Sequence, residues 1–316
     1  MSYKLDASKF ERDGMLKSDA GESVFFLRQL EEIDGQLYNV KYARLEAMDL
    51  LDVHQGNPGA ETYTYRQYDG VAIGEFSSNY ANGSPRADVS GKEFSIPYKS
   101  VRASYGYNIQ EIRAANMGQF NLEAERALKA RRAIDEAMNT AALLGNTATG
   151  MKGLFNQASA NSYTVPADGT GSSALWSAKT ADLILRDMFG IVDTIPTVTK
   201  ELENATHLLL PYARLRTIST KRVDSVNNTT VLEFFQKNRP LVQVRGALYL
   251  DTAGASSVAR MVAYCKSPMH QKWVVSVPFE SFPPQLQGME YVVECHGRMG
   301  GVVSYYPLSI AYGDGI

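Results

Sequence analysis

The clearest pattern along the chain is helical. Between residues 122 and 144, one stripe at helical spacing takes in Leu128, Arg131, Ile134, Met138 and Ala141. Recurrence at intervals of three and four residues indicates an amphipathic helix with one face toward a core. Asn121 is suited to cap the start of this helix and Gly145 to end it. At about 1.5 Å per residue, the helix is long enough to span a domain.

A second helix is predicted for residues 178–194, with a stripe of Ile184, Met188, Ile191 and Ile195. Pro196 is expected to lie beyond its end. Two short helices should follow. Pro211 can open one of them, and the other begins with Thr230 and Glu233 spaced as a capping box.

Residues 61–107 are predicted to be extended. Apolar and polar residues alternate at 61–66 and in parts of 92–96, which is typical of half-buried strands. Between them, residues 77–85 are polar and rich in Gly, Asn, Ser and Pro, as turns are. The pattern predicts a long hairpin with a polar tip. Two-stranded ribbons are marginally stable by themselves, so this hairpin suggests a partner.

The remainder is mostly strand. Residues 207–210 read as a buried strand, and further strands are predicted at 241–250, 260–266, 273–277, 289–296, 302–306 and 309–312. Gly297, Gly300 and Gly301 are interpreted as turns between the later strands. Because helices and strands are segregated rather than regularly alternating, the predicted fold class is α+β.

Residues 1–60 show no clear core pattern of their own. Short apolar clusters lie among charged residues and end in a turn-rich stretch at 55–59. We interpret this segment as an arm that packs on something else, and the alternative is an ordinary peripheral N-terminus.

Composition narrows the classes of function. The 316 residues are 44% hydrophobic, which supports a sizeable core, and the net charge of −2 argues against a dedicated nucleic-acid binder. Two cysteines are too few for a disulfide scaffold and favour a reduced, cytosolic origin. We expect no secretory signal and no membrane span, since no long apolar run occurs.

Motifs of catalysis or metal binding are not found in the sequence. Nucleotide-binding loops and a nucleophile elbow are absent, and the four histidines lie singly, without the spacing of a zinc site. The most tempting cluster is Glu294, Cys295 and His296. On a strand, Glu294 and His296 share a face, where they could act as acid and base or hold a metal. The simpler interpretation makes them polar partners on a solvated face, with Cys295 toward the core.

A basic cluster lies on the long predicted helix. It consists of Arg126, Lys129, Arg131 and Arg132, with acidic residues around it. The cluster could face DNA. The alternative is a solvated face laced with ion pairs.

The order of these elements resembles the major capsid proteins of tailed bacteriophages of the Hong Kong 97 type. The resemblance covers nearly the whole chain. It includes the sequence NTAALLG at 139–145, then MKGLFN at 151–156, and the ending GGVVSYYP at 300–307. It implies a structural protein without cofactor or catalytic residues, which self-assembles as hexamers and pentamers into an icosahedral head around the phage genome.

The resemblance also implies a division into parts. Residues 1–60 would form the N-terminal arm and 61–107 the E-loop hairpin. Residues 108–176 and 289–316 would form the peripheral domain with its spine helix, and 177–288 the axial domain. Contacts between subunits are expected at the E-loop tip and spine helix, through Asn79, Tyr80, Asn82, Arg86, Lys92, Arg126, Lys129 and Arg132.

Some relatives crosslink an E-loop lysine to a neighbour. Lys92 and Lys99 lie in the right region, but no acceptor or catalytic acid can be matched, so the crosslink is not carried over. The implied partners are further copies of the chain, a separate scaffolding protein, a portal, a decoration protein and double-stranded DNA bound without sequence specificity. The implied location is the virion, with assembly in the host bacterial cytoplasm.

Two alternatives remain open at this stage. One is an encapsulin, a bacterial nanocompartment shell with the same fold. The other is a soluble α+β enzyme that uses Glu294 and His296, which would form a monomer or small oligomer.

Overall fold

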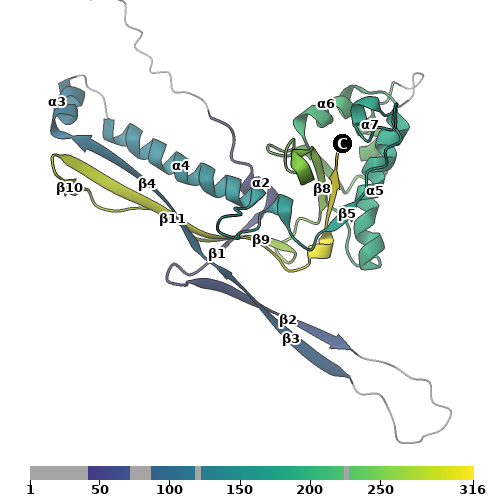
Figure 1. Ribbon diagram of the computed structural model, residues 1–316, viewed down its shortest axis with the longest axis horizontal. Helices are drawn as coiled ribbons and strands as arrows, with labels where there is room; N and C mark the ends of the chain where they lie inside the picture. The colour runs from purple at the N-terminus through teal and green to yellow at the C-terminus, as the bar shows by residue number, and fades with distance from the viewer. Residues whose placement is uncertain (1–41, 72–86, 118–121, 224–227) are drawn as a thin grey trace, which may run out of the picture. The chain divides into compact units, whose positions relative to one another are not determined.

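The computed structural model describes residues 42–71, 87–117, 122–223 and 228–316. Its first sheet has the strand order β1 (Asp52–Gln55), β9 (Gln271–Ser281), β11 (Glu290–Ser304) and β10 (Gln285–Gln287), with β4 (Lys99–Asn108) also paired to β11. The helix α4 (Leu122–Leu144) lies along β4 and β11 (Figure 1). The shorter helices α2 (Ala47–Leu50) and α3 (Ile109–Met117) flank this region.

The second sheet has the order β5 (Asn161–Tyr163), β12 (Ile310–Asp314), β8 (Arg260–Tyr264), β6 (His207–Leu210) and β7 (Gln243–Gly246). The helices α5 (Ala181–Thr199), α6 (Tyr212–Thr220) and α7 (Val231–Asn238) belong to this half. Short 3-10 turns lie at Leu154–Asn156, Trp176–Ala178, Ala255–Ser257 and Pro307–Ser309. Helices and strands are segregated, so the α+β prediction is confirmed.

The predicted hairpin is formed by β2 (Thr62–Val71) and β3 (Asp88–Pro97), which pair antiparallel from Thr62 opposite Pro97 to Val71 opposite Asp88. It is shorter than the predicted 61–107. The last part of that range is β4, which pairs with β11 and not with the hairpin. An extended pattern shows that a segment is a strand, but it does not show which strand is its partner.

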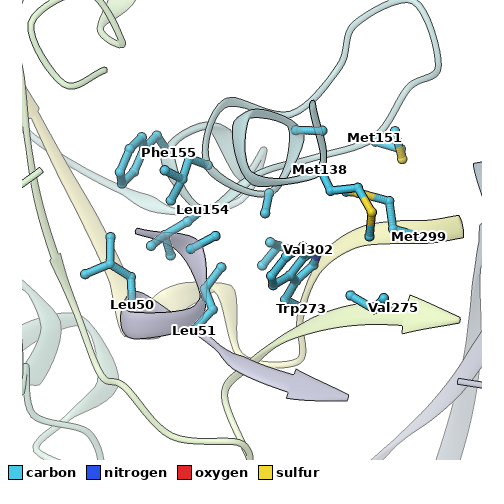
Figure 2. Close-up of a cluster of buried hydrophobic side chains, with 14 of the residues drawn as sticks. Leu50, Leu51, Met138, Met151, Leu154, Phe155, Trp273, Val275, Met299 and Val302 are labelled. Atoms are coloured by element: carbon cyan, nitrogen blue, oxygen red, sulfur yellow. The ribbon is translucent and has the colours of Figure 1, made fainter. Parts of the chain in front are cut away.

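The core beside α4 gathers side chains from distant parts of the sequence (Figure 2). Leu50 and Leu51 are buried there with Met138, Leu154 and Trp273. Residues from Leu45 onward belong to the main compact unit. The stretch 45–55, which the sequence analysis assigned to the arm, therefore contributes to the core of its own chain.

The long helix has the predicted bounds. Ile134, Met138 and Ala141 are buried as predicted, but Leu128 is 59% exposed and Arg131 is also exposed. Ala130 is buried in their place, so only the second half of the predicted stripe was right. Gly145 ends the helix with a φ of 76°, and its N–H donates to the Ala141 carbonyl. Asn121, the predicted N-cap, lies outside the described residues.

The second long helix continues past its predicted end. All four predicted stripe residues of α5 are fully buried, but the helix includes Pro196 and runs to Thr199. Threonine hydroxyls near this end donate to carbonyls one turn back, for example Thr197 to Asp193 at 2.6 Å and Thr199 to Ile195 at 2.8 Å. The prediction that Pro196 stops the helix was wrong. A proline removes one N–H donor, which need not end a helix whose face is firmly buried.

The predicted turns at Gly297 and at Gly300 and Gly301 were also wrong. One strand, β11, runs through all three, with register shifts against β9 between His296 and Gly301. Sheet membership likewise crosses the predicted domain boundaries. The strands β9 and β10, from the range 177–288, pair with β11, whereas β12, from the range 289–316, pairs with β8.

Candidate assembly surfaces

The base of the β2–β3 hairpin is fixed by aromatic side chains. The Tyr63 and Tyr305 hydroxyl oxygens lie 2.7 Å apart in a hydrogen bond that either can donate. The Tyr65 ring meets Tyr305 edge-on at 5.0 Å and stacks on Phe94 at 5.2 Å. Burial, followed by the bond to Tyr63, raises the pKa of Tyr305.

Away from its base the hairpin buries little. Along β3 every residue but Ile96 is exposed, and Tyr68 and Val89 remain 69% and 67% exposed. Cross-strand contacts there are polar, such as the ion pair between Arg66 Nε and Glu93 Oε2 at 3.1 Å. Both faces of this ribbon are thus available to another molecule.

The predicted contact residues of the hairpin fall in two groups. Asn79, Tyr80, Asn82 and Arg86 lie outside the described residues. Lys92 lies within the described residues, where it is exposed on β3, opposite Gln67. Lys99, the other lysine considered for crosslinking, begins β4 opposite Met299 in the first sheet. These contacts stay predictions.

The basic cluster on α4 makes contacts within its own chain. The Arg126 guanidinium donates to both carboxylate oxygens of Glu111, each at 3.0 Å, and also to the Gly106 carbonyl. Hydrogen bonding to Arg126 lowers the pKa of Glu111. Arg131 Nε lies 3.8 Å from Asp135 Oδ2, one turn along the helix. These two pairs fit the solvated, ion-paired interpretation.

The other two basic residues differ in exposure. Lys129 is exposed and Arg132 is half-buried. Arg126 holds α3 against the first turns of α4, so its replacement would disturb the subunit itself. Lys129 is therefore the cleaner position at which to look for a contact between subunits.

Glu294 and His296 lie on the solvent side of β11, as predicted, with Cys295 buried between them. Burial raises the pKa of the Cys295 thiol. His296 Nε2 lies 3.8 Å from Glu280 Oε2, and the ring stacks on Phe282 with centroids 5.3 Å apart. The carboxylate that pairs with His296 thus belongs to the neighbouring strand.

Glu294 and His296 line a hollow of about 410 Å³. Its walls also include Ser100, Arg102, Ala103, Ser104, Phe282 and Cys295. The hollow lies on the β4–β11 face, and its lining mixes charged, polar and apolar side chains. These surroundings fit polar partners on a sheet face.

One cluster was missed by the sequence analysis. Glu203, Cys265 and His270 bring a carboxylate, a thiol and an imidazole within 4.8 Å of one another. Only Cys265 and His270 are near in sequence, and Glu203 comes from a remote segment, so no local spacing joins the three. Separately, none of the helices in the described ranges has the length and apolarity that crossing a bilayer requires.

Solved structures with a similar fold are capsid subunits or virus-like particles. The capsid of Myoviridae phage XM1 matches with a TM-score of 0.80 at 16% identity, covering 93% of this chain and 99% of that one. The capsid of a native GTA particle matches with a TM-score of 0.62 at 11% identity, covering 90% and 94%. A virus-like particle from Pyrococcus furiosus matches with a TM-score of 0.53 at 12% identity, covering 84% and 91%. The fold is that of a shell-forming subunit of the Hong Kong 97 type.

A family model described as "Major capsid protein" matches residues 74–316. The chain belongs to the major capsid protein family, and the predicted resemblance is confirmed. Its function is structural, as a subunit of a capsid shell. No curated protein matches the sequence. The family match gives no support to the nanocompartment or enzyme alternatives.

Proposed function

We propose that this major capsid protein assembles as hexamers and pentamers into the icosahedral head of a tailed bacteriophage, and that the hairpin β2–β3 is its main inter-subunit clamp. The exposed ribbon carries the proposal. Tyr68 on β2 is 69% exposed and Val89 on β3 is 67% exposed. Strands with so little burial in their own chain are not held in a fixed position. A neighbouring subunit supplies that burial.

In this proposal the parts keep their predicted roles, with the two sheets in place of the predicted residue boundaries. Within residues 1–60, the arm ends where the stretch 45–55 joins the core. The β2–β3 hairpin acts as the E-loop. The half built on α4 forms the peripheral domain. The half built on α5 forms the axial domain, which meets its copies at the centres of hexamers and pentamers. Asn79, Tyr80, Asn82, Arg86, Lys92, Arg126, Lys129 and Arg132 contribute contacts from the hairpin and the spine helix.

The mechanism is physical and not catalytic. Many weak contacts between identical surfaces close into a symmetric shell. A separate scaffolding protein directs curvature, a portal occupies one vertex, and a decoration protein can cover the outside. Double-stranded DNA is packed within without sequence-specific binding. Assembly takes place in the host bacterial cytoplasm, and the product is the virion.

The decisive experiment replaces residues 72–87, which connect β2 and β3, with a short Gly-Ser turn. The ladder down to Val71 opposite Asp88 is kept intact. Shortening a loop changes closure entropy by only about 0.6 kcal/mol per halving, so the subunit should fold normally. Circular dichroism and thermal melting check that expectation.

The variant is then co-expressed with the neighbouring phage genes, and the products are examined for shells by negative-stain microscopy. We expect folded subunits and no regular particles, because a contact repeated at every subunit has been removed. A matched variant, Lys92→Ala, keeps the loop and tests one exposed side chain on β3. Normal shells from the loop replacement would contradict the clamp, and a loss of folding would place the loop in the core.

A further inference from the structure

Three side chains from different segments meet beside the link between the two sheets. Glu203 lies between α5 and β6, Cys265 directly follows β8, and His270 directly precedes β9. Their ligand atoms all lie within 4.8 Å of one another. Neither the capsid fold nor the proposed clamp accounts for this meeting of carboxylate, thiol and imidazole.

The His270 ring is buried without a hydrogen bond to either nitrogen in the described part of the chain. His270 is only 9% exposed, and its ring nitrogens are buried. Nε2 lies 2.7 Å from Glu203 Oε2, within the distance of an ion pair. The angles between the two groups do not fit a hydrogen bond. Buried polar groups normally have a partner, and each exception needs an explanation.

The backbones of all three residues are held in place. The Glu203 N–H donates to Thr199 Oγ1 at 3.2 Å, the Cys265 N–H to the Ser309 carbonyl at 3.1 Å, and the His270 N–H to the Ser267 carbonyl at 3.0 Å. The Tyr306 ring also packs on His270, with centroids 5.6 Å apart. These bonds fix the backbones that carry the three side chains.

We propose that Glu203, Cys265 and His270 bind one divalent transition-metal ion of the zinc class. Sulfur, imidazole nitrogen and carboxylate oxygen are the donors that zinc takes, whereas magnesium and calcium prefer oxygen alone. Around a tetrahedral zinc, bonded at ~2.0–2.3 Å, ligand atoms lie about 3.3–3.8 Å apart. Binding needs Glu203 Oε2 and His270 Nε2, which lie 2.7 Å apart, to separate slightly. The fourth position is left for water.

The charges and protons balance. The Cys265 thiol, whose pKa is raised first by burial and then by the Glu203 charge, gives up one proton to solvent when the ion binds. Thiolate and carboxylate then neutralise the two positive charges of the ion, and the imidazole stays neutral. Because a proton is released, affinity rises with pH. The Glu203 side chain is 30% exposed and provides the entry side.

The site has a defined structural consequence. The chain leaves the second sheet at the end of β8 and enters the first at the start of β9. An ion held by Cys265 and His270 at the two ends of this link, and by Glu203 from beside β6, would fix the link against the second sheet. Metal binding would then stabilise the folded chain by mass action.

The experiment uses the untagged full chain, stripped with a chelator and dialysed against zinc or cobalt. Metal content is measured by elemental analysis. The cobalt form is examined for a thiolate-to-cobalt charge-transfer band and tetrahedral d–d bands. We expect one ion per chain, both spectral features, and a rise in melting temperature with zinc. Cys265→Ser should lose the charge-transfer band, and His270→Asn should lose the ion.

The matched control is Cys295→Ser, which alters the other buried thiol outside the cluster. It should keep the ion, the band and the zinc-dependent rise in melting temperature. To separate folding from binding, each variant is also melted in chelator, where Cys265→Ser and the unaltered chain should agree closely. An unaltered, folded chain that takes up no ion would overturn the proposal and leave only a carboxylate–imidazole pair. A charge-transfer band that survives in Cys265→Ser would do the same.

Discussion

Two antiparallel pairs of strands in this molecule each have a ladder of ten paired residues, but their surroundings differ. The ribbon pairs β2 with β3 from Thr62 to Val71, and the first sheet pairs β4 with β11 from Lys99 to Asn108. The backbone pairing is alike. On β11, however, Val293, Cys295 and Met299 are buried against the core beside α4, whereas β3 has only Ile96 even partly covered. Burial, and not the ladder itself, separates the two.

The difference shows what a strand pair needs. A backbone hydrogen bond made in water adds only about 0.5–1.5 kcal/mol net, and ordering each residue costs a similar or larger amount. The β4–β11 pair is stabilised by side chains of its own chain. In the described part of the ribbon, the packing is confined to its base, where Tyr63, Tyr65 and Ile96 lie against Tyr305 and a small buried cluster. Under the proposed function, the neighbouring subunit supplies the rest.

The largest expected effect comes from replacing the same residue type in the two pairs. Val293, 3% exposed on β11, and Val89, 67% exposed on β3, are each changed to Ala. Losing two buried methyl groups and leaving a small cavity should lower the free energy of unfolding by about 1.5–3 kcal/mol for Val293→Ala. Val89→Ala should stay within about 0.5 kcal/mol. Urea unfolding of the unassembled subunit measures both, and equal losses would break the comparison.

A glycine on β11 tests how tightly that strand is packed. A Cβ at Gly297 would lie 2.9 Å from Ile134 Cγ2 and 2.9 Å from Met138 Sδ, so Gly297→Ala forces these side chains or the strand to shift. We expect a loss of about 1–3 kcal/mol, as for other overpacked cores. Gly300→Ala is the matched control, because its Cβ would meet nothing closer than Tyr98 Cδ1 at 3.5 Å. Urea midpoints that shift equally in both variants would contradict this account.

These glycines also show where sequence reasoning stops. Local patterns predicted the existence of both long helices, the capping box at Thr230 and the hairpin, but not the end of α5 or the extent of the hairpin. They misread Gly297, because a glycine needed for close packing looks the same in sequence as one needed for a turn. Gly301 does adopt a φ of 84°, but within a strand with shifted register.

The other misses involve residues that are distant in sequence. The partner of β4, the burial of Leu50 and Leu51, and the cluster of Glu203 with Cys265 and His270 all depend on contacts between remote segments. No local pattern carries that information. The whole-chain order of elements nevertheless indicated the capsid family, since an order of parts survives where single motifs are weak.

A smaller effect is expected at the ribbon's anchor. Tyr63→Phe removes the 2.7 Å hydrogen bond to Tyr305 and keeps the ring packing. The loss should be about 0.5–1.5 kcal/mol, and it should be local, because only the ribbon depends on this bond. Hydrogen exchange of β2 and β3 amides in the unassembled subunit should therefore quicken, while β11 amides are unchanged. Tyr68→Phe, at an exposed site on the same ribbon, should leave exchange as it was.

The smallest effect on the subunit should come from the ion pair between Arg66 and Glu93. The two side chains are 68% and 57% exposed, so solvent screens their attraction, and such pairs contribute about 0–1 kcal/mol. The double variant Arg66→Gln with Glu93→Gln should unfold at the same urea concentration as the unaltered subunit. In an assembled shell the same pair would be covered by a neighbour, where screening is weaker and a contact is repeated at every subunit. Shells of the double variant should thus dissociate at a lower urea concentration, measured by light scattering, although their subunits are equally stable. Shells that dissociate together with those of the unaltered protein would mean that this part of the ribbon stays in solvent after assembly, and the clamp would then have to be confined to the Tyr63 end or to the connector beyond Val71.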